Sequence, residues 1–568
     1  MKRTTWTKWF SVLAAGGALT MAEVRSAEAC GCFTPPDPAV PVVQAGERIA
    51  FAIDSGQVTA HIQIQYAGAA GDFGWLLPLP SLPKLELGND EVFNQLIATT
   101  QPKYEMTKVF NGNCQFNNRL NGLSGAAPNA PGTGKGVDDQ SQPSPLVIQS
   151  SVGPYTYAVL KADSKQAMLD WLAQNHYFVP VGTDDVVAPY VHPGAFFLAL
   201  KLRPGNASGD LQPVVVHYAS DLPMIPIVLS SVAAQKNMGI QVWMLGAARA
   251  IPRNYYHTVI NDAEIDWLTA GQNYNDVIIR AAGESPKHHT FVTEYAGSSS
   301  VMKNLLNAPG RFGNADELRA QHDPGLFASY MSQHGFPFDA QVVAILQKYI
   351  PFPSGISAMG VTAPQYYQQL GYWLGQYRKQ NPQAFAGYDF TFDPAPVTDD
   401  LESRVVMPTL AAGALFDQFP YLTRLYTTLS PEDMNADPVF SFNPDLPAVS
   451  NIHQGTLTYE CGAYGSGDQN STYAWLQTPD GARVIYPNGT GTPPPLAAMP
   501  ASRRIEILRE AGAPVVVVDN SDAIAHALSN GGGCSVNFGG SPNGAGLALL
   551  FGLVALAFGL RRRASNRA

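Results

Sequence analysis

The sequence predicts an α+β protein made mainly of antiparallel β-sheet layers, with a helical segment in its second half and one C-terminal transmembrane helix. Three observations support this prediction. In the first 300 residues, apolar and polar residues alternate in short runs, as in strands with one buried face. Between about 301 and 435 the apolar period lengthens to three or four residues, as in amphipathic helices. The 17 residues Gly544–Leu560 are apolar throughout, and a helix of that length rises about 25 Å, enough to cross a bilayer core.

The first 29 residues have the layout of a secretory signal peptide. Basic residues stand near the start, an apolar stretch runs from Trp9 to Met21, and Ala27-Glu28-Ala29 precedes Cys30. A small-x-small triplet is the usual cleavage site, so we expect cleavage between Ala29 and Cys30 and export of the remaining chain. The alternative is a lipoprotein signal with Cys30 as the acylated residue, but that signal prefers leucine at the position of Ala27.

Seven segments are expected along the chain. They are the signal peptide at 1–29, a β-rich domain at 30–300 with a disordered loop at 111–145, a helical segment at 301–435, a small α+β domain at 436–530, a flexible linker at 531–543, the transmembrane helix at 544–560 and a cytoplasmic basic tail at 561–568. About 500 exported residues are too many for one hydrophobic core, which favours several domains. The loop is predicted from its Gly, Asn, Ser, Pro and Ala content.

The body between the two terminal segments is acidic. The leader and the stretch after Cys534 each hold four basic residues and together only two acidic ones, which leaves 27 basic and 43 acidic residues and a net charge of −16. An acidic surface argues against nucleic acid as a partner. Charged residues are only 14% of the chain, against 52 glycines and 45 prolines, a composition that suits strands and loops around a real core.

The β-rich region is predicted element by element. Arg48–Asp54 and Gln57–Tyr66 form a hairpin through Ser55-Gly56. Phe73–Pro80 reads as an edge strand interrupted by prolines, and Asn89 caps a helix over Asp90–Ala98. The other predicted elements are a helix at Ser164–Asn175 and strands at Tyr155–Leu160, Ala195–Arg203, Pro213–Tyr218, Ile225–Ala233 and Gly239–Leu245.

The second half begins with helices and ends with strands. In Pro364–Gln380, Tyr366, Leu370, Trp373 and Tyr377 recur at helical spacing and form a largely aromatic stripe. This aromatic stripe is assigned to the core, with sugar binding as the alternative. Ser430 starts a helical turn through Pro431 and Glu432. Beyond it, we expect strands at Leu457–Cys461, Ala474–Gln477 and Arg483–Tyr486, a helix at Ser502–Ala511 and a buried strand at Val515–Val518.

Motifs for catalysis, cofactors and metals are missing from the sequence. It contains no HExxH, no EF-hand loop, no complete phosphate loop and no nucleophile elbow. No catalytic residue, no cofactor-binding residue and no metal ligand is therefore assigned, and no cofactor is expected. Glu294 is the one carboxylate of interest, because it lies in the apolar run Phe291–Tyr295 and needs a partner such as an arginine there. A structural pair is preferred to a catalytic role.

The five cysteines are Cys30, Cys32, Cys114, Cys461 and Cys534. With Cys534 assigned to the tail, four remain, and an even number in an exported body predicts disulfides. Cys30 and Cys32 are too close to pair comfortably, so each is expected to bond with Cys114 or Cys461. Buried free thiols are the alternative.

Several segments resemble an uncharacterised bacterial family, the domain of unknown function 2330 group, which is typical of myxobacteria and their relatives. The similar segments are Ala29–Gly31, a turn at Gln44–Arg48, Phe73–Pro80, Phe291–Gly297, Tyr421–Leu425, Ser430–Glu432 and Asp437–Phe440. Together they extend from about Cys30 to Asn451. The resemblance implies no activity, substrate or site, and the loop at 111–145 departs from it.

The tail is similar to the MYXO-CTERM type of sorting signal. Cys534 lies beside a Gly/Ser spacer, followed by the short apolar span and the cluster Arg561, Arg562 and Arg563. Basic residues next to a span stay in the cytoplasm, so these arginines are the predicted topology anchor. The resemblance implies that a sorting protease cuts near Cys534 and that the body is displayed on the cell surface, lipid-attached through this cysteine. The alternative is a permanent membrane anchor.

These predictions describe an exported, membrane-anchored protein whose body lies in the periplasm or on the cell surface. Its expected partners are the membrane, through the C-terminal helix, and a sorting protease. A non-catalytic binding or envelope protein is the preferred function, and a secreted cell-surface hydrolase with a site built from distant residues is the alternative. A deep pocket with convergent acids or histidines would favour the hydrolase, and shallow loop-rimmed faces the binding protein.

Overall fold

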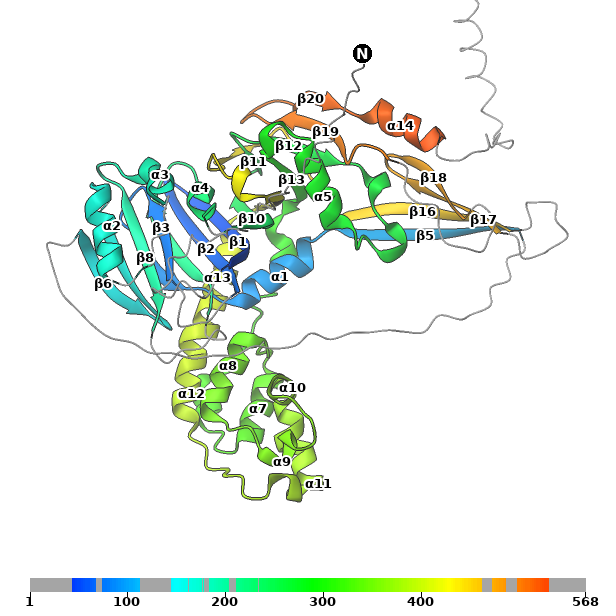
Figure 1. Cartoon of the computed structure of the whole chain (residues 1–568). Coiled ribbons are helices and arrows are strands. Elements are labelled where there is room, and N and C mark those ends of the chain that lie inside the picture. Colours follow the sequence, from blue (N-terminus) through cyan, green and yellow to red (C-terminus); the bar gives the residue numbers. More distant parts are fainter. Residues whose placement is uncertain are drawn as a thin grey trace, which may run out of the picture.

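The computed structural model describes residues 43–67, 74–112, 145–161, 163–175, 177, 183–203, 211–232, 234–461, 472–486 and 498–530. Over these residues the protein is α+β, with antiparallel and mixed sheets and a helical second half, as predicted (Figure 1). None of the helices in these ranges is both long and apolar enough to cross a membrane. The signal peptide, residues 113–144 of the predicted loop, the linker, the span Gly544–Leu560 and the basic tail lie outside the described residues.

A ten-stranded mixed sheet, here called the main sheet, has the strand order β20-β19-β12-β13-β14-β10-β1-β2-β9-β4. Its strands are β1 (Val43–Asp54), β2 (Gln57–Ala67), β4 (Lys84–Leu87), β9 (Val214–Ala219), β10 (Ala234–Gly246), β12 (Tyr256–Ile260), β13 (Thr290–Ser298), β14 (Tyr421–Leu429), β19 (Ser502–Ile507) and β20 (Val515–Asp519). The predicted β1–β2 hairpin is confirmed. Its turn residues Ser55 and Gly56 both have positive φ, at 50° and 75°, as a two-residue primed turn requires.

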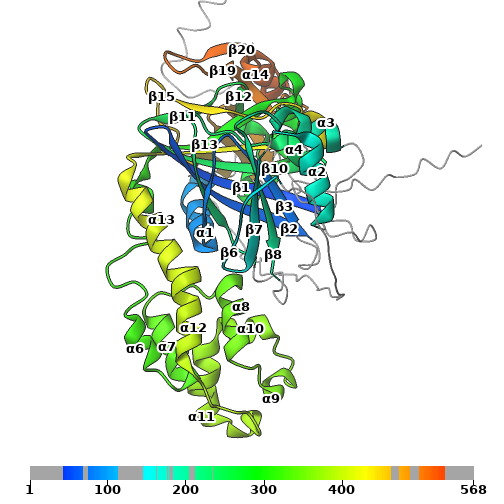
Figure 2. The ribbon, with the colours of Figure 1, turned by 90° about the vertical axis from the view of Figure 1, so that its left-hand side faces the viewer.

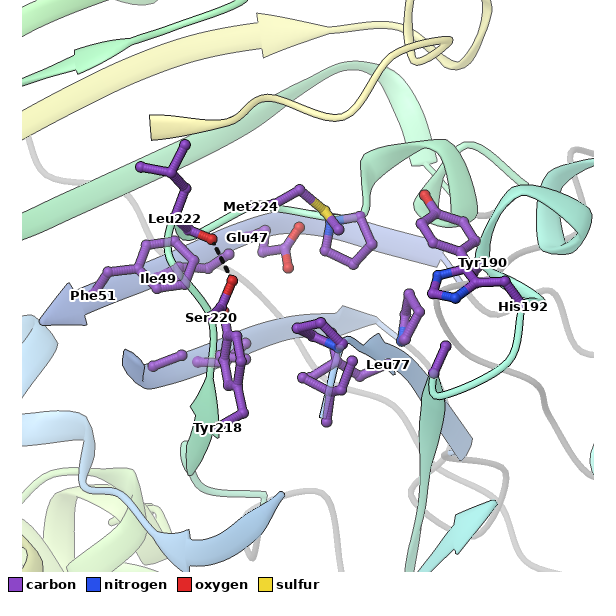
Figure 3. A pocket seen from close by; sticks show the side chains of 17 residues that line it. Glu47, Ile49, Phe51, Leu77, Tyr190, His192, Tyr218, Ser220, Leu222 and Met224 are labelled. Carbon is purple, nitrogen blue, oxygen red and sulfur yellow. Dashed lines mark hydrogen bonds between the residues drawn. The ribbon is translucent and has the colours of Figure 1, made fainter. Parts of the chain in front are cut away.

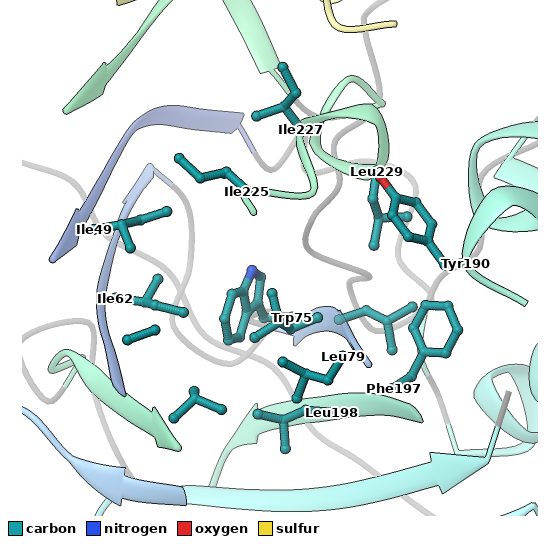
Figure 4. Close-up of a cluster of buried hydrophobic side chains, with 14 of the residues drawn as sticks. Ile49, Ile62, Trp75, Leu79, Tyr190, Phe197, Leu198, Ile225, Ile227 and Leu229 are labelled. Carbon is teal, nitrogen blue, oxygen red and sulfur yellow. The ribbon is translucent and has the colours of Figure 1, made fainter. Parts of the chain in front are cut away.

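A four-stranded antiparallel sheet, the small sheet, packs on one face of the main sheet. Its order is β3-β8-β7-β6, formed by β3 (Gly74–Leu79), β6 (Leu146–Val152), β7 (Tyr155–Lys161) and β8 (Phe196–Leu202). Strand β3 is an edge strand, as predicted from its prolines. Side chains of both sheets form one buried cluster, with Ile49 and Ile62 from the main sheet and Trp75, Leu79 and Leu198 from the small sheet (Figure 4). Helix α2 (Lys165–Gln174) joins the same cluster.

The other face of the main sheet is covered by α1 (Asp90–Thr100) and α13 (Met407–Gln418). Phe93 of α1 and Phe416 of α13 pack with Trp243 and Leu422 of the sheet. Helix α1 starts as predicted, because the Asn89 side chain accepts a hydrogen bond from the Glu91 amide at 2.7 Å. This capping bond satisfies one of the free amides of the first turn.

In the sequence, the helices of the second half stand between β13 and β14, which are neighbours in the main sheet. In space these helices, apart from α13, form a group outside the sheets, below them in Figure 2. They are α6 (Ala315–Arg319), α7 (Pro324–Gln333), α8 (Ala340–Tyr349), α9 (Ser354–Ser357), α10 (Ala363–Gln368), α11 (Arg378–Gln380), α12 (Pro394–Leu401) and α13, with π-helical turns at Tyr372–Tyr377 and Glu402–Val406. Their core includes the fully buried Tyr366 and Leu370, so this part of the aromatic stripe is core, while Trp373 and Tyr377 are half-buried.

Two further sheets complete the fold, one with four strands and one with two. The sheet β18-β17-β16-β5 is built from β5 (Lys103–Gly112), β16 (Ile452–Cys461), β17 (Thr472–Thr478) and β18 (Gly481–Tyr486), and it confirms the three strands predicted after residue 455. The ribbon β11-β15 pairs β11 (Arg249–Pro252) with β15 (Phe440–Asn443). The remaining helices are α3 (Thr183–Val187), α4 (Ile227–Ser230), α5 (Tyr274–Gly283) and α14 (Ser521–Asn530).

Several local predictions were wrong. The predicted strand at Ile225–Ala233 contains the short helix α4 instead. The predicted helix Ser502–Ala511 is strand β19, because pairing with β12 and β20 outweighs local helix propensity. The predicted buried strand Val515–Val518 is β20 at the sheet edge, where Val515, Val516 and Val517 are 40%, 47% and 45% exposed.

Candidate functional site

A pocket of about 170 Å³ lies between the main sheet and the small sheet (Figure 3). Strands β1, β2 and β9 contribute to it from the main sheet and β3 from the small sheet, and segments 190–195 and 220–226 complete the lining. The walls are largely apolar: Ile49, Phe51, Ala60, Ile62, Leu77 and Leu79 line them. A dry cavity of similar size accommodates a benzene-sized molecule.

Glu47 is the carboxylate in this pocket, and the geometry of β1 explains its position. Side chains two residues apart in a strand share a face, so Glu47 points to the same side as Ile49 and Phe51, and all three line the pocket. A β-bulge at the step from Gln44 to Gly46 comes directly before it. Bulges commonly redirect a side chain near a functional site.

The sequence contains a signal for Glu47 in the alternation of strand β1. The turn predicted at Gln44–Arg48 is instead part of this strand, and Glu47 occupies an inward position of the alternating pattern Ile49, Phe51, Ile53. A charged residue in phase with buried apolar residues is the kind of exception that marks a functional site.

The environment of Glu47 disfavours its charged form. The residue is 4% exposed, and its Oε2 atom is buried without a hydrogen-bond partner among the described residues. Burial raises the pKa of Glu47 to about 7. Close to neutral pH, the carboxyl group therefore exchanges between a neutral hydrogen-bond donor and an anion.

The hydroxyl groups of Ser220 and Tyr190, which line the pocket, are hydrogen-bonded to other groups of the protein. The Ser220 hydroxyl donates to the Leu222 carbonyl at 2.8 Å (Figure 3). The Tyr190 hydroxyl contacts the Asp437 carboxylate oxygens at 2.9 and 2.7 Å, and one of those oxygens also accepts from the Val228 amide at 3.0 Å. Glu47 differs from these two hydroxyl groups because it is buried in the pocket and its Oε2 atom has no hydrogen-bond partner among the described residues.

A second polar cluster links β11, β12, β13 and β19. Thr293 Oγ1 lies 3.0 Å from His257 Nε2, and His257 Nδ1 lies 3.2 Å from Glu506 Oε2. The Arg249 guanidinium donates to Thr293 Oγ1 at 3.1 Å. The order hydroxyl, imidazole, carboxylate is that of a nucleophile, a base and an orienting acid.

Burial limits what this second cluster can do. Thr293, His257 and Glu506 are at most 7% exposed, and burial lowers the pKa of His257. A nucleophile must be reachable by the substrate carbonyl, and Thr293 is not reachable in this conformation. The hydrogen bonds fix strands β11, β12, β13 and β19 to one another.

Glu294 has the partner that the sequence predicted. Arg424 of β14 donates to Glu294 through Nε, and both side chains are almost completely buried. Glu294 is the extra residue of a β-bulge between Thr293 and Tyr295, and the Tyr274 hydroxyl donates to its second oxygen at 2.7 Å. The carboxylate therefore has structural partners for both oxygens.

The other predicted site residues are mostly outside the described residues. This holds for Ala29 and Cys30 at the cleavage site, for Cys32, Cys114 and Cys534, and for Arg561, Arg562 and Arg563. Cys461 is described as the last residue of β16, where the backbone register places it opposite Gly112 of β5. Across the described ranges, no group of three His, Cys, Asp or Glu residues is arranged to hold a metal ion.

Comparison with known proteins gives a family without an activity. No curated protein and no solved structure matches the chain. The sequence model of the family described as "Uncharacterized protein conserved in bacteria (DUF2330)" matches residues 24–306. This stretch contains strands β1 to β13 and every residue that lines the pocket, whereas the helical segment from α6 onward follows it. Over residues 24–306 the chain is therefore similar to the DUF2330 family of uncharacterised bacterial proteins.

Proposed function

We propose that this chain is an exported binding protein, held at the membrane or displayed on the cell surface, and that the pocket around Glu47 is its ligand site. The observation that carries the proposal is a buried carboxylate that has no hydrogen-bond partner among the described residues and lies in an apolar pocket. A buried polar group without a hydrogen bond costs roughly 1–3 kcal/mol. A ligand that supplies the missing bond offsets this cost and buries its own apolar surface against the pocket walls.

The binding site can be tested by filling the pocket. Ala60 lines the pocket and is 1% exposed, so Ala60→Met should occupy the space that a ligand needs. Ala158, which is 3% exposed in the same core cluster but does not line the pocket, gives the matched control Ala158→Met. Ligand-detected NMR with small apolar compounds should show binding to the wild type and to Ala158→Met but not to Ala60→Met. Equal binding to all three proteins would reject this pocket as the site.

The cellular location is proposed from the two ends of the sequence. A basic, then apolar leader with Ala27-Glu28-Ala29 supports export, and the apolar span before three arginines supports a membrane tether. Cys534→Ala tests the sorting step, with Ser541→Ala in the same spacer as control. Sorting predicts that only Cys534→Ala changes the mature size and membrane partition. An unchanged product from Cys534→Ala would instead favour a permanent anchor.

A secreted hydrolase is the second candidate, and the Thr293–His257–Glu506 arrangement is the observation that favours it. If Thr293 acts as a nucleophile after a local opening, purified protein should hydrolyse an activated ester, and Thr293→Ser should keep this activity while Thr293→Val loses it. Activity that is unchanged in Thr293→Val would exclude this mechanism. The pocket-filling variant Ala60→Met leaves the cluster intact, so it separates the two functions.

A further inference from the structure

We infer that the pocket around Glu47 selects a compact organic cation, a protonated amine on a small apolar body, over neutral and anionic ligands of the same shape. The inference rests on the proposed function of the pocket and adds the chemical class of its ligand. Three features of the described residues support it, namely the polarity of the lining, the aromatic side chains around it and the charge of the body.

The pocket offers an acceptor and few donors. Three of its lining residues are Pro78, Pro80 and Pro226, and proline has no backbone N–H to donate to a carboxylate or carbonyl. The hydroxyl groups of Ser220 and Tyr190 already donate to other oxygens. An anionic ligand would therefore meet the Glu47 carboxylate while the Ser220 and Tyr190 hydroxyl groups donate elsewhere, and Tyr218 and, at the rim, His192 are the further side-chain donors of the lining. Two carboxylates close together in a buried site repel each other, which is unfavourable.

Glu47 fits a cation better than a neutral donor. An ammonium group beside a buried carboxylate forms a charge-assisted hydrogen bond, which is roughly twice as strong as a neutral one. Phe51, Tyr190 and Tyr218 also line the pocket, and aromatic faces attract cations. The body carries a net charge of −16 between Cys30 and Cys534, which raises the local concentration of cations near its surface.

The other titratable groups that line the pocket are Tyr190, Tyr218 and His192. Burial raises the pKa values of Tyr190 and Tyr218 above the ordinary tyrosine value, so both stay neutral. His192 lies exposed at the rim, with Nδ1 3.4 Å from the Pro193 carbonyl. The cation requires ionised Glu47, so its affinity should rise by about 100-fold from pH 5 to pH 8 for a carboxyl group with a pKa of about 7.

The test uses three probes with the same ring: benzylamine, benzyl alcohol and benzoate. Calorimetric titration of the full exported body at pH 8 should give the order benzylamine, then benzyl alcohol, then benzoate. Glu47→Gln should weaken benzylamine by about 10- to 100-fold, the equivalent of one hydrogen bond to a charged group, and should leave benzyl alcohol within a few-fold. Glu105→Gln removes an exposed carboxylate and should change neither probe.

The possible outcomes distinguish a failure of the cation selectivity from a failure of the pocket as a binding site. Benzoate or benzyl alcohol that binds as tightly as benzylamine, with binding lost in Ala60→Met, would overturn the cation selectivity and keep the pocket as a binding site. Benzylamine binding that Glu105→Gln weakens as much as Glu47→Gln does would also overturn it, because the amine would then be attracted only to the acidic surface. Failure of all three probes to bind would overturn both.

Discussion

Replacing Glu47 with glutamine should stabilise the protein, and the gain should grow with pH. The folded protein raises the pKa of this carboxyl from 4.5 to about 7. Between these values the folded state keeps a proton that the unfolded state has released. The stability of the wild type therefore falls as the pH rises through this window, whereas glutamine has no proton to lose.

The magnitude follows from the size of the shift. Each pKa unit corresponds to about 1.4 kcal/mol, so the difference between folded and unfolded values amounts to about 3 kcal/mol above pH 7 and vanishes below pH 4.5. Urea unfolding of the wild type and Glu47→Gln at pH 4.5, 6 and 8 measures this directly. The gain in unfolding free energy of Glu47→Gln over the wild type should increase by about 3 kcal/mol over that range.

Glu105→Gln serves as the control, because Glu105 is exposed on β5. Its unfolding free energy should follow that of the wild type at every pH. A difference between Glu47→Gln and the wild type that does not change with pH would show that folding does not raise the pKa of Glu47. So would a wild type that gains stability relative to Glu47→Gln as the pH rises, since that requires a partner that holds Glu47 in its charged form.

Three further predictions follow from other parts of the structure. Arg424→Met leaves Glu294 buried without its cation and should lower the free energy of unfolding, measured in urea, by about 3–5 kcal/mol. A second change, Glu294→Met, should restore most of this loss. A loss below 1 kcal/mol in Arg424→Met would contradict the assigned pairing. The exposed apolar edge strand β20 should promote self-association that Val516→Lys reduces in sedimentation velocity, since charge on an edge strand blocks pairing. The backbone register places Cys461 opposite Gly112, two residues before Cys114 in the sequence, which favours a pairing different from the one expected from the sequence, in which Cys30 and Cys32 take these partners. Peptide mapping without reduction should recover a peptide linking Cys114 to Cys461; pairing of both cysteines with Cys30 and Cys32 would contradict this.

Local patterns predicted those elements whose signal is local. The hairpin at Ser55-Gly56, the cap at Asn89 and the proline-bearing edge strand β3 depend on a few neighbouring residues, and the structure contains all three. Glu294 could also be assigned a partner type, because a carboxylate in an apolar strand needs a donor. The identity of that partner, Arg424, depends on a strand 130 residues away and was not predictable.

The failed predictions concern long-range pairing. Residues Val515–Val518 look like a core strand by composition, but their exposure depends on whether another strand follows β20 in the sheet. The pocket depends on the packing of the small sheet over β1 and β2, which no local period reveals. In the sequence, Glu47 is recognisable only as a charged residue in the alternating apolar pattern of β1. Its role depends on the apolar side chains that surround it in the fold.

Glu47 lies in an apolar pocket without a hydrogen-bond partner among the described residues, and its titration can be followed directly. Carbon-13 NMR of protein labelled at glutamate carboxyls, assigned by the loss of one signal in Glu47→Gln, reports the protonation of this group. We expect a titration midpoint near pH 7 in the free protein, which moves to lower pH when benzylamine is bound. A midpoint near the ordinary glutamate value of about 4.3, unchanged by benzylamine, would show that Glu47 is neither desolvated in the pocket nor in contact with the bound amine.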